Sequence, residues 1–222
     1  FAHQEIGEVE VLLRDGRALT PKQSRAINAI IGNIADHSQG GVELETAREY
    51  GLTWLYDTSA ESIRRKIKLH WADLVNIYPF SLSPKSDDCL TESVANAFIE
   101  WLIDTCIKLD VRVDTRMLDD PATMRYVYAC LLERKCCICG KAADFHHCGA
   151  HNDQQSSHIG MGRDRKEVCH IGLLGLPLCR EHHSLTHDKG DQWMIDLYKL
   201  IPIQVDERIA KANGLNTKEK NT

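Results

Sequence analysis

The 222-residue sequence predicts an α+β protein with two domains: a mostly helical N-terminal domain with a short sheet, residues 1–130, and a cysteine- and histidine-rich domain, residues 131–211. Three observations predict this. Apolar residues recur every three or four positions through most of the first domain, as in amphipathic helices. One early stretch alternates instead, as a half-buried strand does. In the second domain, two Cys/His pairs enclose a group of histidines. The polar residues 212–222 are expected to be disordered.

The N-terminal domain is predicted to begin with a strand at residues 8–13, which alternates in hydropathy before the Asp15-Gly16 turn. A helix follows at Thr20-Pro21-Lys22-Gln23, where Thr is a good N-cap, Pro suits the first helical position and Gln can complete a capping box. This helix is expected to stop near Gly40-Gly41. Its apolar face consists of Ile27, Ile30, Ile31 and Ile34.

Three further helices are predicted before residue 135. The first passes through residues 63–74 and ends before Pro79, the second runs from Thr91 to Leu109, and the third starts at Asp120-Pro121 and continues towards Lys135. We interpret their apolar stripes as core packing, and the domain contains no Walker-type or GxGxxG phosphate loop. The stripes are Ile63, Ile67, Trp71 and Leu74; Val94, Phe98, Trp101, Leu102 and Ile103; and Val127 and Leu131.

The composition is that of an ordinary globular protein, with 43% hydrophobic and 27% charged residues. No run approaches the ~18 apolar residues of a membrane span, and the start lacks the pattern of a signal peptide, so we expect no membrane partner. Nine cysteines are too few for a disulfide scaffold, and four of them lie within residues 130–139. This clustering indicates metal binding in a reducing compartment and therefore a cytoplasmic protein.

The net charge of −5 is unevenly distributed. Residues 1–130 carry 14 Lys and Arg against 20 Asp and Glu, a net of −6, whereas residues 131–222 carry 13 against 12, a net of +1. Strong non-specific DNA binding depends on phosphate neutralisation by Lys and Arg, so the acidic half argues against it. Local contacts to nucleic acid remain compatible with this distribution.

Two ligand pairs predict a structural metal site. Cys136 and Cys139 form a C-x2-C pair followed by Gly140, and Cys179 and His182 repeat the spacing forty residues later. A Cys3His set suits a closed tetrahedral Zn2+ site, which would join the two ends of a segment that has little apolar core of its own. Two alternatives stay open: another cysteine replaces one ligand, or the thiols are simply buried. The cysteines available for such a replacement are Cys137 and Cys148.

Four histidines within this segment predict a second site. His183 and His187 are four residues apart and so share one face of a helix. With one member of the His146-His147 pair they can form a three-imidazole metal site with open coordination positions. Adjacent residues of a strand point to opposite sides, so one histidine can bind metal while the other faces a water. The alternatives are a second structural zinc site, or surface histidines with no shared role.

The order C-x2-C-G, His-His, C-x2-H and H-x3-H resembles the HNH, or ββα-metal, endonuclease family over about residues 134–200. The segments Cys-Ile-Cys-Gly-Lys-Ala-Ala-Asp-Phe-His-His, Gly-Met-Gly-Arg-Asp-Arg and Leu-Cys-Arg-Glu-His-His further resemble HNH nucleases encoded by phages of Gram-positive bacteria. The resemblance implies a zinc-stapled ββα-metal (HNH) domain. It also implies that His146 binds a catalytic divalent metal together with His183 and His187, and that His147 is the general base.

The sequence departs from the family pattern in two places. His182 stands where zinc-binding HNH proteins have a cysteine, and imidazole is also a good zinc ligand. The middle Asn of the motif is missing, since its region contains Leu173, Leu174 and Gly175; His170 is the nearest polar candidate for the bracing role.

The chemistry of the second site leaves several assignments open. Three imidazoles suit Zn2+, Ni2+ or Mn2+ better than Mg2+, although Mg2+ with substrate oxygens stays an alternative. Asp144 or a backbone carbonyl would orient His147. Arg163, Arg165 and Lys166 are candidates to hold the phosphate, and ordinary solvated loop charges are the alternative.

Residues 19–27, Leu-Thr-Pro-Lys-Gln-Ser-Arg-Ala-Ile, are similar to a segment of the lambda Orf (NinB) recombination mediators. That resemblance implies a dimer that binds single-stranded DNA, with Lys22 and Arg25 as phosphate contacts. A second basic cluster consists of Arg64, Arg65, Lys66 and Lys68. The net charge of the domain favours a solvated helix face there, unless a dimer gathers these charges into a channel.

Together these patterns predict a metal-dependent HNH DNA endonuclease. We expect a homodimeric phage recombination protein that binds and cleaves single-stranded or branched DNA in the cytoplasm of a bacterial host, with phage or host recombination proteins as partners. A non-catalytic single-strand-binding mediator with a zinc-held ββα module is the alternative, favoured by the missing Asn. A sequence-specific restriction or homing enzyme is a third, although no helix-turn-helix pattern supports it.

Overall fold

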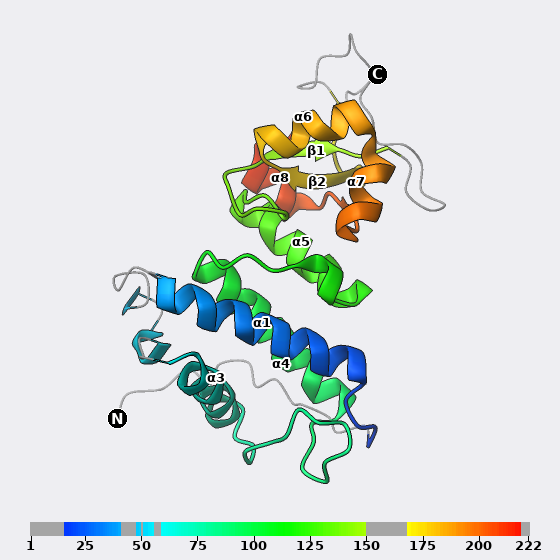
Figure 1. Cartoon of the computed structure of the whole chain (residues 1–222). Helices are drawn as coiled ribbons and strands as arrows, with labels where there is room; N and C mark the ends of the chain where they lie inside the picture. The colour runs from blue at the N-terminus through cyan, green and yellow to red at the C-terminus, as the bar shows by residue number, and fades with distance from the viewer. Residues whose placement is uncertain (1–15, 41–47, 50, 56–58, 150–167, 219–222) are drawn as a thin grey trace, which may run out of the picture.

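The computed structural model describes residues 16–40, 48–49, 51–55, 59–149 and 168–218, and the α+β prediction is confirmed (Figure 1). The strand predicted at residues 8–13 lies outside the described residues. The helices are α1 (Pro21–Gly40), α3 (Ala60–Leu74), α4 (Glu92–Lys108), α5 (Asp120–Glu133), α6 (Arg180–Lys189), α7 (Asp191–Tyr198) and α8 (Glu207–Asn213). The strands are β1 (Asp144–His147), β2 (Leu174–Leu178) and β3 (Ile203–Gln204), and short 3-10 turns lie at Thr53–Leu55 and Thr115–Met117.

Helix α1 begins with the capping box that the sequence predicts. The Gln23 backbone N–H donates to Thr20 Oγ1 at 3.1 Å, and the Thr20 N–H donates to Gln23 Oε1 at 2.8 Å. The same Gln23 amide donates to the Glu92 carbonyl and to Asn96 Oδ1, which joins the start of α1 to α4. The predicted isoleucine face is buried against α3 and α4.

The buried faces of α3 and α4 are the predicted apolar stripes, except at Leu74 and Trp101. Helix α3 ends at Leu74, ahead of Pro79, and Asn76 there adopts a positive φ of 52°. Leu74 is 57% exposed, so the buried face of α3 ends at Ala72 and does not include this predicted member. Trp101 of α4 is half-buried and stacks on Phe98, whose ring also packs against Trp71 and Phe80.

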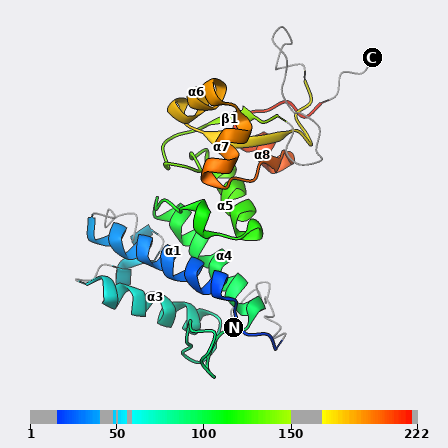
Figure 2. The same cartoon turned by 45° about the vertical axis from the view of Figure 1, so that its right-hand side comes forward.

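Helix α5 connects the two parts of the molecule (Figures 1 and 2). The helix starts at Asp120, as predicted, and the Asp119 side chain just before it accepts from the Ala122 N–H and caps its first turn. One side of α5 packs on α4, whereas the other packs on α8, β2 and β3. The expected division between residues 130 and 131 therefore falls inside a helix that both parts share, and one continuous hydrophobic core runs through it.

The three strands form an antiparallel sheet in the order β1-β2-β3. Asp144 pairs with Leu178 and His147 with Gly175, so the two histidines of β1 lie beside the start of the fully buried β2. Helix α6 packs on β1 and β2, which gives the β-β-α arrangement expected from the resemblance. The described N-terminal part contains only isolated bridges, Ala18–Thr91 and Ser81–Cys89, in place of a sheet.

The segment after residue 211 differs from the expected disorder as far as it is described, which is to Lys218. Helix α8 extends to Asn213 and ends at Gly214, where φ is 63°. Leu215 packs against the core, and the Asn216 carbonyl accepts from the His170 N–H at 2.9 Å. We expected disorder because the segment is polar, but these specific contacts hold it against the core.

Among the described residues, every helix is too short or too polar to cross a lipid bilayer.

Candidate metal centre

Four side chains converge at the junction of α5, β2 and α6. The ligand atoms of Cys136, Cys139, Cys179 and His182 all lie within 4.8 Å of one another. Cys136 Sγ is 3.6 Å from His182 Nδ1, Cys139 Sγ is 3.6 Å from Cys179 Sγ, and Cys179 Sγ is 3.2 Å from His182 Nδ1. Tetrahedral Zn2+ with ordinary Zn–S and Zn–N bonds requires ligand separations of about 3.3–3.8 Å. The donor set and its spacing therefore fit a metal ion.

The backbone presents these ligands from two local structures. Cys136 directly follows α5, and its carbonyl accepts from the Gly140 N–H at 2.8 Å in a tight turn. Gly140 has a φ of 76°, which favours glycine. Cys179 is the N-cap residue of α6, so His182 lies in the first turn of the helix and faces back towards the thiols. Two unrelated segments thus meet at one point.

The electrostatics of the four ligands are those of a site that needs a positive charge. Burial raises the pKa of the Cys136 thiol to about 12. Burial also opposes ionisation of Cys179, but hydrogen bonds from the His182 N–H and from the thiols of Cys139 and Cys136 outweigh it, so the pKa of Cys179 lies below its ordinary value. Burial lowers the pKa of His182. A buried thiolate such as Cys136 would be stabilised by a bound cation.

A second cluster lies where β1 meets α6. His146, His183 and His187 have ligand nitrogens within 4.8 Å of one another. The His146 ring centroid is 4.7 Å from that of His183 and 5.3 Å from that of His187. His183 and His187 stack at 4.9 Å, as the four-residue spacing on one helix face predicts. Burial, followed by the neighbouring His146 and His187, lowers the pKa of His183 to about 4, so it is a neutral imidazole near pH 7.

Within the described part of the chain, two buried nitrogens of this cluster have no hydrogen-bond partner, namely Nδ1 of His146 and Nδ1 of His183. Leaving a buried polar atom unsatisfied costs roughly 1–3 kcal/mol. Nearby imidazole nitrogens with free lone pairs form the donor set of a histidine metal site. The residues present therefore fit a divalent metal here as well.

Asp191 positions His146 from the other side. Its Oδ1 is 3.0 Å from His146 Nε2, and its other oxygen accepts from the Gly149 N–H. Asp191 is the first residue of α7, so the start of that helix lies against the end of β1. A carboxylate on the second nitrogen of a ligating histidine fixes the tautomer and the direction of the first nitrogen.

His147 points to the opposite side of β1 from His146. Its ring centroid lies 4.8 Å from that of Phe145 and 5.1 Å from that of His170. His170 is buried, and its Nδ1 is 3.2 Å from the Asn216 carbonyl. The Asn216 amide in turn donates to the Val168 carbonyl. The structure thus brings His170 beside His147, through the segment that follows α8.

Gly175 leaves the space that the Phe145 ring fills. A Cβ atom on Gly175 would lie 2.0 Å from Phe145 Cζ, far closer than atoms can approach. Gly175 pairs directly with His147 across the β1–β2 ladder. Gly175 lies in the region where the family pattern has its Asn, and here it allows the Phe145 ring to pack closely beside His147.

His147, His170 and His183 line an open pocket of about 460 Å³. Arg134, at the end of α5, and Arg180, at the start of α6, line the same pocket and are exposed. Asp144 also lines it and tends to raise the pKa of His183, against the larger effects that lower it. The pocket therefore combines imidazoles with two cations that could meet an anionic substrate.

Several expected site residues lie elsewhere. Arg163, Arg165 and Lys166 are outside the described residues. Lys22 and Arg25 are exposed on α1, in the helical part of the molecule away from the sheet (Figures 1 and 2). Cys137 and Cys148 are buried but do not belong to the four-ligand cluster.

Sequence reasoning missed four residues at this centre: Asp191, Asn216, Arg134 and Arg180. The position of Arg180 beside Cys179 and of Arg134 just before Cys136 was a usable signal, because both ligand pairs were identified. Asp191 and Asn216 reach the site through tertiary packing, for which the sequence offered no local pattern.

Comparison with known families agrees with this geometry. A family described as "Putative HNHc nuclease" matches residues 3–216. No curated protein and no solved structure matches the chain. The match covers the helical part as well as the metal centre, and the chain therefore belongs to this HNH nuclease family.

Proposed function

We propose that this protein is a divalent-metal-dependent DNA endonuclease that hydrolyses phosphodiester bonds at the three-histidine cluster. The observation that carries the proposal is the cluster of His146, His183 and His187 next to His147, in a chain that belongs to an HNH nuclease family. The open pocket with Arg134 and Arg180 adds room and charge for a phosphate.

Structural Zn2+ is the proposed occupant of Cys136, Cys139, Cys179 and His182. Three thiols and one imidazole at tetrahedral spacing are the donor set typical of structural zinc. All four positions are protein ligands, so no coordination position remains for substrate. Its task is to hold the start of α6, and thus His183 and His187, against the end of α5.

The catalytic divalent metal would be held by His146, His183 and His187, whose two unsatisfied Nδ1 atoms support this assignment. Bound there, the cation would polarise the scissile phosphate and stabilise the leaving 3′ oxygen. Neutral imidazoles favour Zn2+, Ni2+ or Mn2+ over Mg2+. Asp191 holds the His146 ring so that its other nitrogen faces the cluster.

His147 is the proposed general base. It takes a proton from the attacking water as the new phosphorus–oxygen bond forms and the bond to the 3′ oxygen breaks. An imidazole with a pKa near neutrality suits this task. The rings of Phe145 and His170 fix the orientation of His147, and His170 is held by the Asn216 carbonyl. His170 thus supports the site where the family pattern has Asn.

Arg134 and Arg180 are the proposed phosphate contacts within the described residues. Both line the pocket that contains His147. One guanidinium group can donate two hydrogen bonds to two oxygens of the same phosphate. Arg163, Arg165 and Lys166 join them in the proposal on the basis of sequence. Single-stranded or branched DNA as substrate, a homodimer and a task in phage recombination rest on the likeness of residues 19–27 to the recombination mediators.

The test is cleavage of labelled single-stranded, duplex, flap and four-way-junction DNA in the presence of Mg2+, Mn2+, Ni2+ or no added metal. We expect metal-dependent cutting by the wild type and a loss of about 10²–10⁴-fold in His147→Ala, the range typical of general-base removal. His37→Ala, which removes an exposed histidine from α1, is the matched control and should cut normally.

Zinc content and the melting temperature of His147→Ala should equal those of the wild type, because His147 contacts neither metal cluster in the proposed scheme. Binding without cutting on every substrate and in every metal would refute the nuclease. That result would instead favour a DNA-binding module whose ββα unit is held together by zinc.

A further inference from the structure

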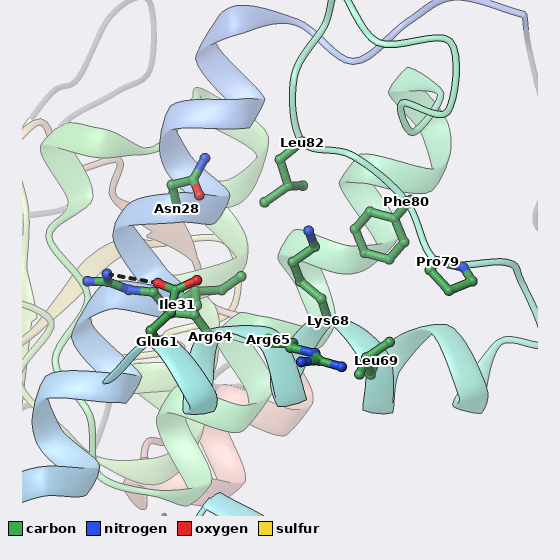
Figure 3. A pocket seen from close by; sticks show the side chains of 10 residues that line it. All are labelled: Asn28, Ile31, Glu61, Arg64, Arg65, Lys68, Leu69, Pro79, Phe80 and Leu82. Atoms are coloured by element: carbon green, nitrogen blue, oxygen red, sulfur yellow. Dashed lines mark ion pairs between the residues drawn. The ribbon is translucent and has the colours of Figure 1, made fainter. Parts of the chain in front are cut away.

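A second pocket lies on the helical part of the molecule, between α1, α3 and the segment after α3 (Figure 3). Its volume is about 590 Å³, within the range of roughly 300–1,000 Å³ that ligand sites in proteins have. Asn28 and Ile31 contribute from α1. In Figure 1, α1 and α3 lie below α5, whereas β1 and α6, which contain the three clustered histidines, lie above it, so this pocket is separate from the candidate metal centre.

One wall of the pocket is basic. Arg64, Arg65 and Lys68 line it from successive turns of α3, against a single carboxylate, Glu61. Arg64 pairs with Glu61 at only 3.9 Å, and both groups are largely solvent-accessible, so this ion pair contributes little. Within the described part of the chain, no carboxylate forms an ion pair with Arg65 or Lys68. This concentration of positive charge stands out because residues 1–130 carry a net charge of −6.

The opposite wall is apolar and firmly held. Pro79, Phe80 and Leu82 form it; Pro79 is exposed, whereas Phe80 is 7% and Leu82 8% exposed, and Leu69 adds an apolar side chain on the α3 side. The Ser24 hydroxyl donates to the Leu82 carbonyl at 2.7 Å, which ties this segment to α1. Phe80 packs edge-on against Trp71 and Phe98, and Lys68 Nζ lies 5.5 Å from the centre of the Phe80 ring. Figure 3 shows Lys68 pointing into the space between Phe80 and Leu82.

We propose that this pocket, which we call the α1–α3 groove, binds a segment of single-stranded nucleic acid. Arg65 and Lys68, assisted by Arg64, would contact phosphates, and the exposed Pro79, with the small exposed parts of Phe80 and Leu82 beside it, would contact the face of an unstacked base. Single-stranded nucleic acid offers phosphates to the basic wall and unstacked bases to the apolar wall. In a duplex the base faces are stacked inside the helix, so the apolar wall would have no partner.

Two exposed residues close to groove residues in the sequence, one aromatic and one basic, offer the same kinds of contact as the groove. Tyr78 is 88% exposed and immediately precedes Pro79 of the apolar wall. An exposed aromatic ring beside a basic groove offers a platform on which a neighbouring base can stack. Arg25 lies three residues before Asn28 on α1, so it lies near the same side of the helix, one turn away. Tyr78 and Arg25 are thus each close in the chain to a residue that lines the groove.

This inference deepens the proposed function and rests on it for the choice of nucleic acid over other anions. It assigns strand holding to the helical part and hydrolysis to the metal centre. A substrate that contains a single-stranded segment could then contact both regions at once, as a branched DNA does.

The experiment measures binding of a fluorescein-labelled single-stranded oligonucleotide to the full chain by anisotropy, without added divalent metal. Arg65→Ala/Lys68→Ala removes two charges from the groove. Lys108→Ala/Lys211→Ala removes two exposed charges, from α4 and α8, that do not line the groove and is the matched control. Thermal unfolding checks that both double variants fold like the wild type.

We expect the groove variant to lose about 25-fold in affinity near 0.1 M salt, and its salt dependence to become less steep by about 1.4. Those values correspond to the loss of two phosphate contacts on a single strand. The control variant should lose much less. Equal losses in the two variants would refute the groove as the binding site.

Two competitors test the identity of the ligand. An abasic oligonucleotide of the same length has the same charge but no bases, and should compete at least about fivefold less well. Equal competition by the abasic strand, or by a duplex of the same length, would overturn the proposal in favour of a simple anionic contact. Because no arm depends on cleavage, a failure here and a failure of the nuclease proposal are separate results.

Discussion

The replacement of Gly175 by alanine tests the packing beneath His147 directly. A Cβ atom at residue 175 would lie 2.0, 2.4 and 2.7 Å from three atoms of the Phe145 ring. Ordinary carbon contacts are about 3.5–4.0 Å, so the ring must move by roughly 1.5 Å. Gly175 is not among the glycines with positive φ, so the cost is steric. Overpacking of this kind costs about 1–3 kcal/mol.

For a chain of 222 residues, such a loss should lower the melting temperature by roughly 2–12 °C. The assay is thermal unfolding of four proteins: the wild type, Gly175→Ala, Phe145→Ala and the double variant. Removing the ring removes the clash. Gly175→Ala should therefore cost at least about 1 kcal/mol with Phe145 present and close to nothing in the Phe145→Ala background.

Displacement of Phe145 should also disturb His147, because the two ring centroids are only 4.8 Å apart. DNA cleavage by Gly175→Ala should fall further than the loss of folded protein explains. An equal thermal cost with and without the Phe145 ring would refute this account of the packing, whatever the activity of the variant.

Three further predictions concern the two metal clusters and the pocket. Cys179→Ser should lose about one equivalent of bound zinc, measured by atomic emission, and should melt roughly 10 °C lower than the wild type. If the variant keeps all its zinc, Cys179 is not one of the zinc ligands. Asp191→Asn should weaken Mn2+ binding by about 10–100-fold in calorimetry while leaving the zinc content unchanged, and an unchanged Mn2+ affinity would argue against its positioning of His146. Arg180→Ala should lower kcat/KM for DNA about tenfold or more without changing the melting temperature, whereas normal kinetics would exclude a phosphate contact at Arg180.

Local sequence signals predicted the helices well. The capping box at Thr20 and Gln23 and the Asp-Pro start of α5 each depend on residues a few positions apart, and both formed as expected. The end of α3 was also predicted, since the helix stops at Leu74, ahead of Pro79, and Asn76 follows with a positive φ. The expected domain division at residue 130 stays a prediction, and the structure adds that α5, which spans this position, packs on both α4 and α8.

The candidate site could be anticipated where ligands lie close together in sequence. The C-x2-C and C-x2-H pairs and the H-x3-H spacing define short local structures, and these bring the seven proposed metal ligands into two clusters. Asp191 and Asn216 could not be anticipated, since each reaches the site from a different element through the tertiary fold. Asn216 was not considered as a site residue because the polar composition after residue 211 led us to expect disorder there. Composition does not predict a few specific backbone hydrogen bonds.

Helix α5 ends at Glu133, and Cys136 follows it almost at once, so the proposed zinc site lies at the tip of the helix that both parts of the molecule share. Binding of zinc to the folded chain alone would raise its stability by about 2.7 kcal/mol at a free zinc concentration one hundred times the Kd. Because the core is continuous through α5, that stabilisation would extend to the distant α1–α3 groove. Removal of zinc would therefore lower the melting temperature of both regions together, and a chelator would make strand binding more sensitive to heat without touching the groove.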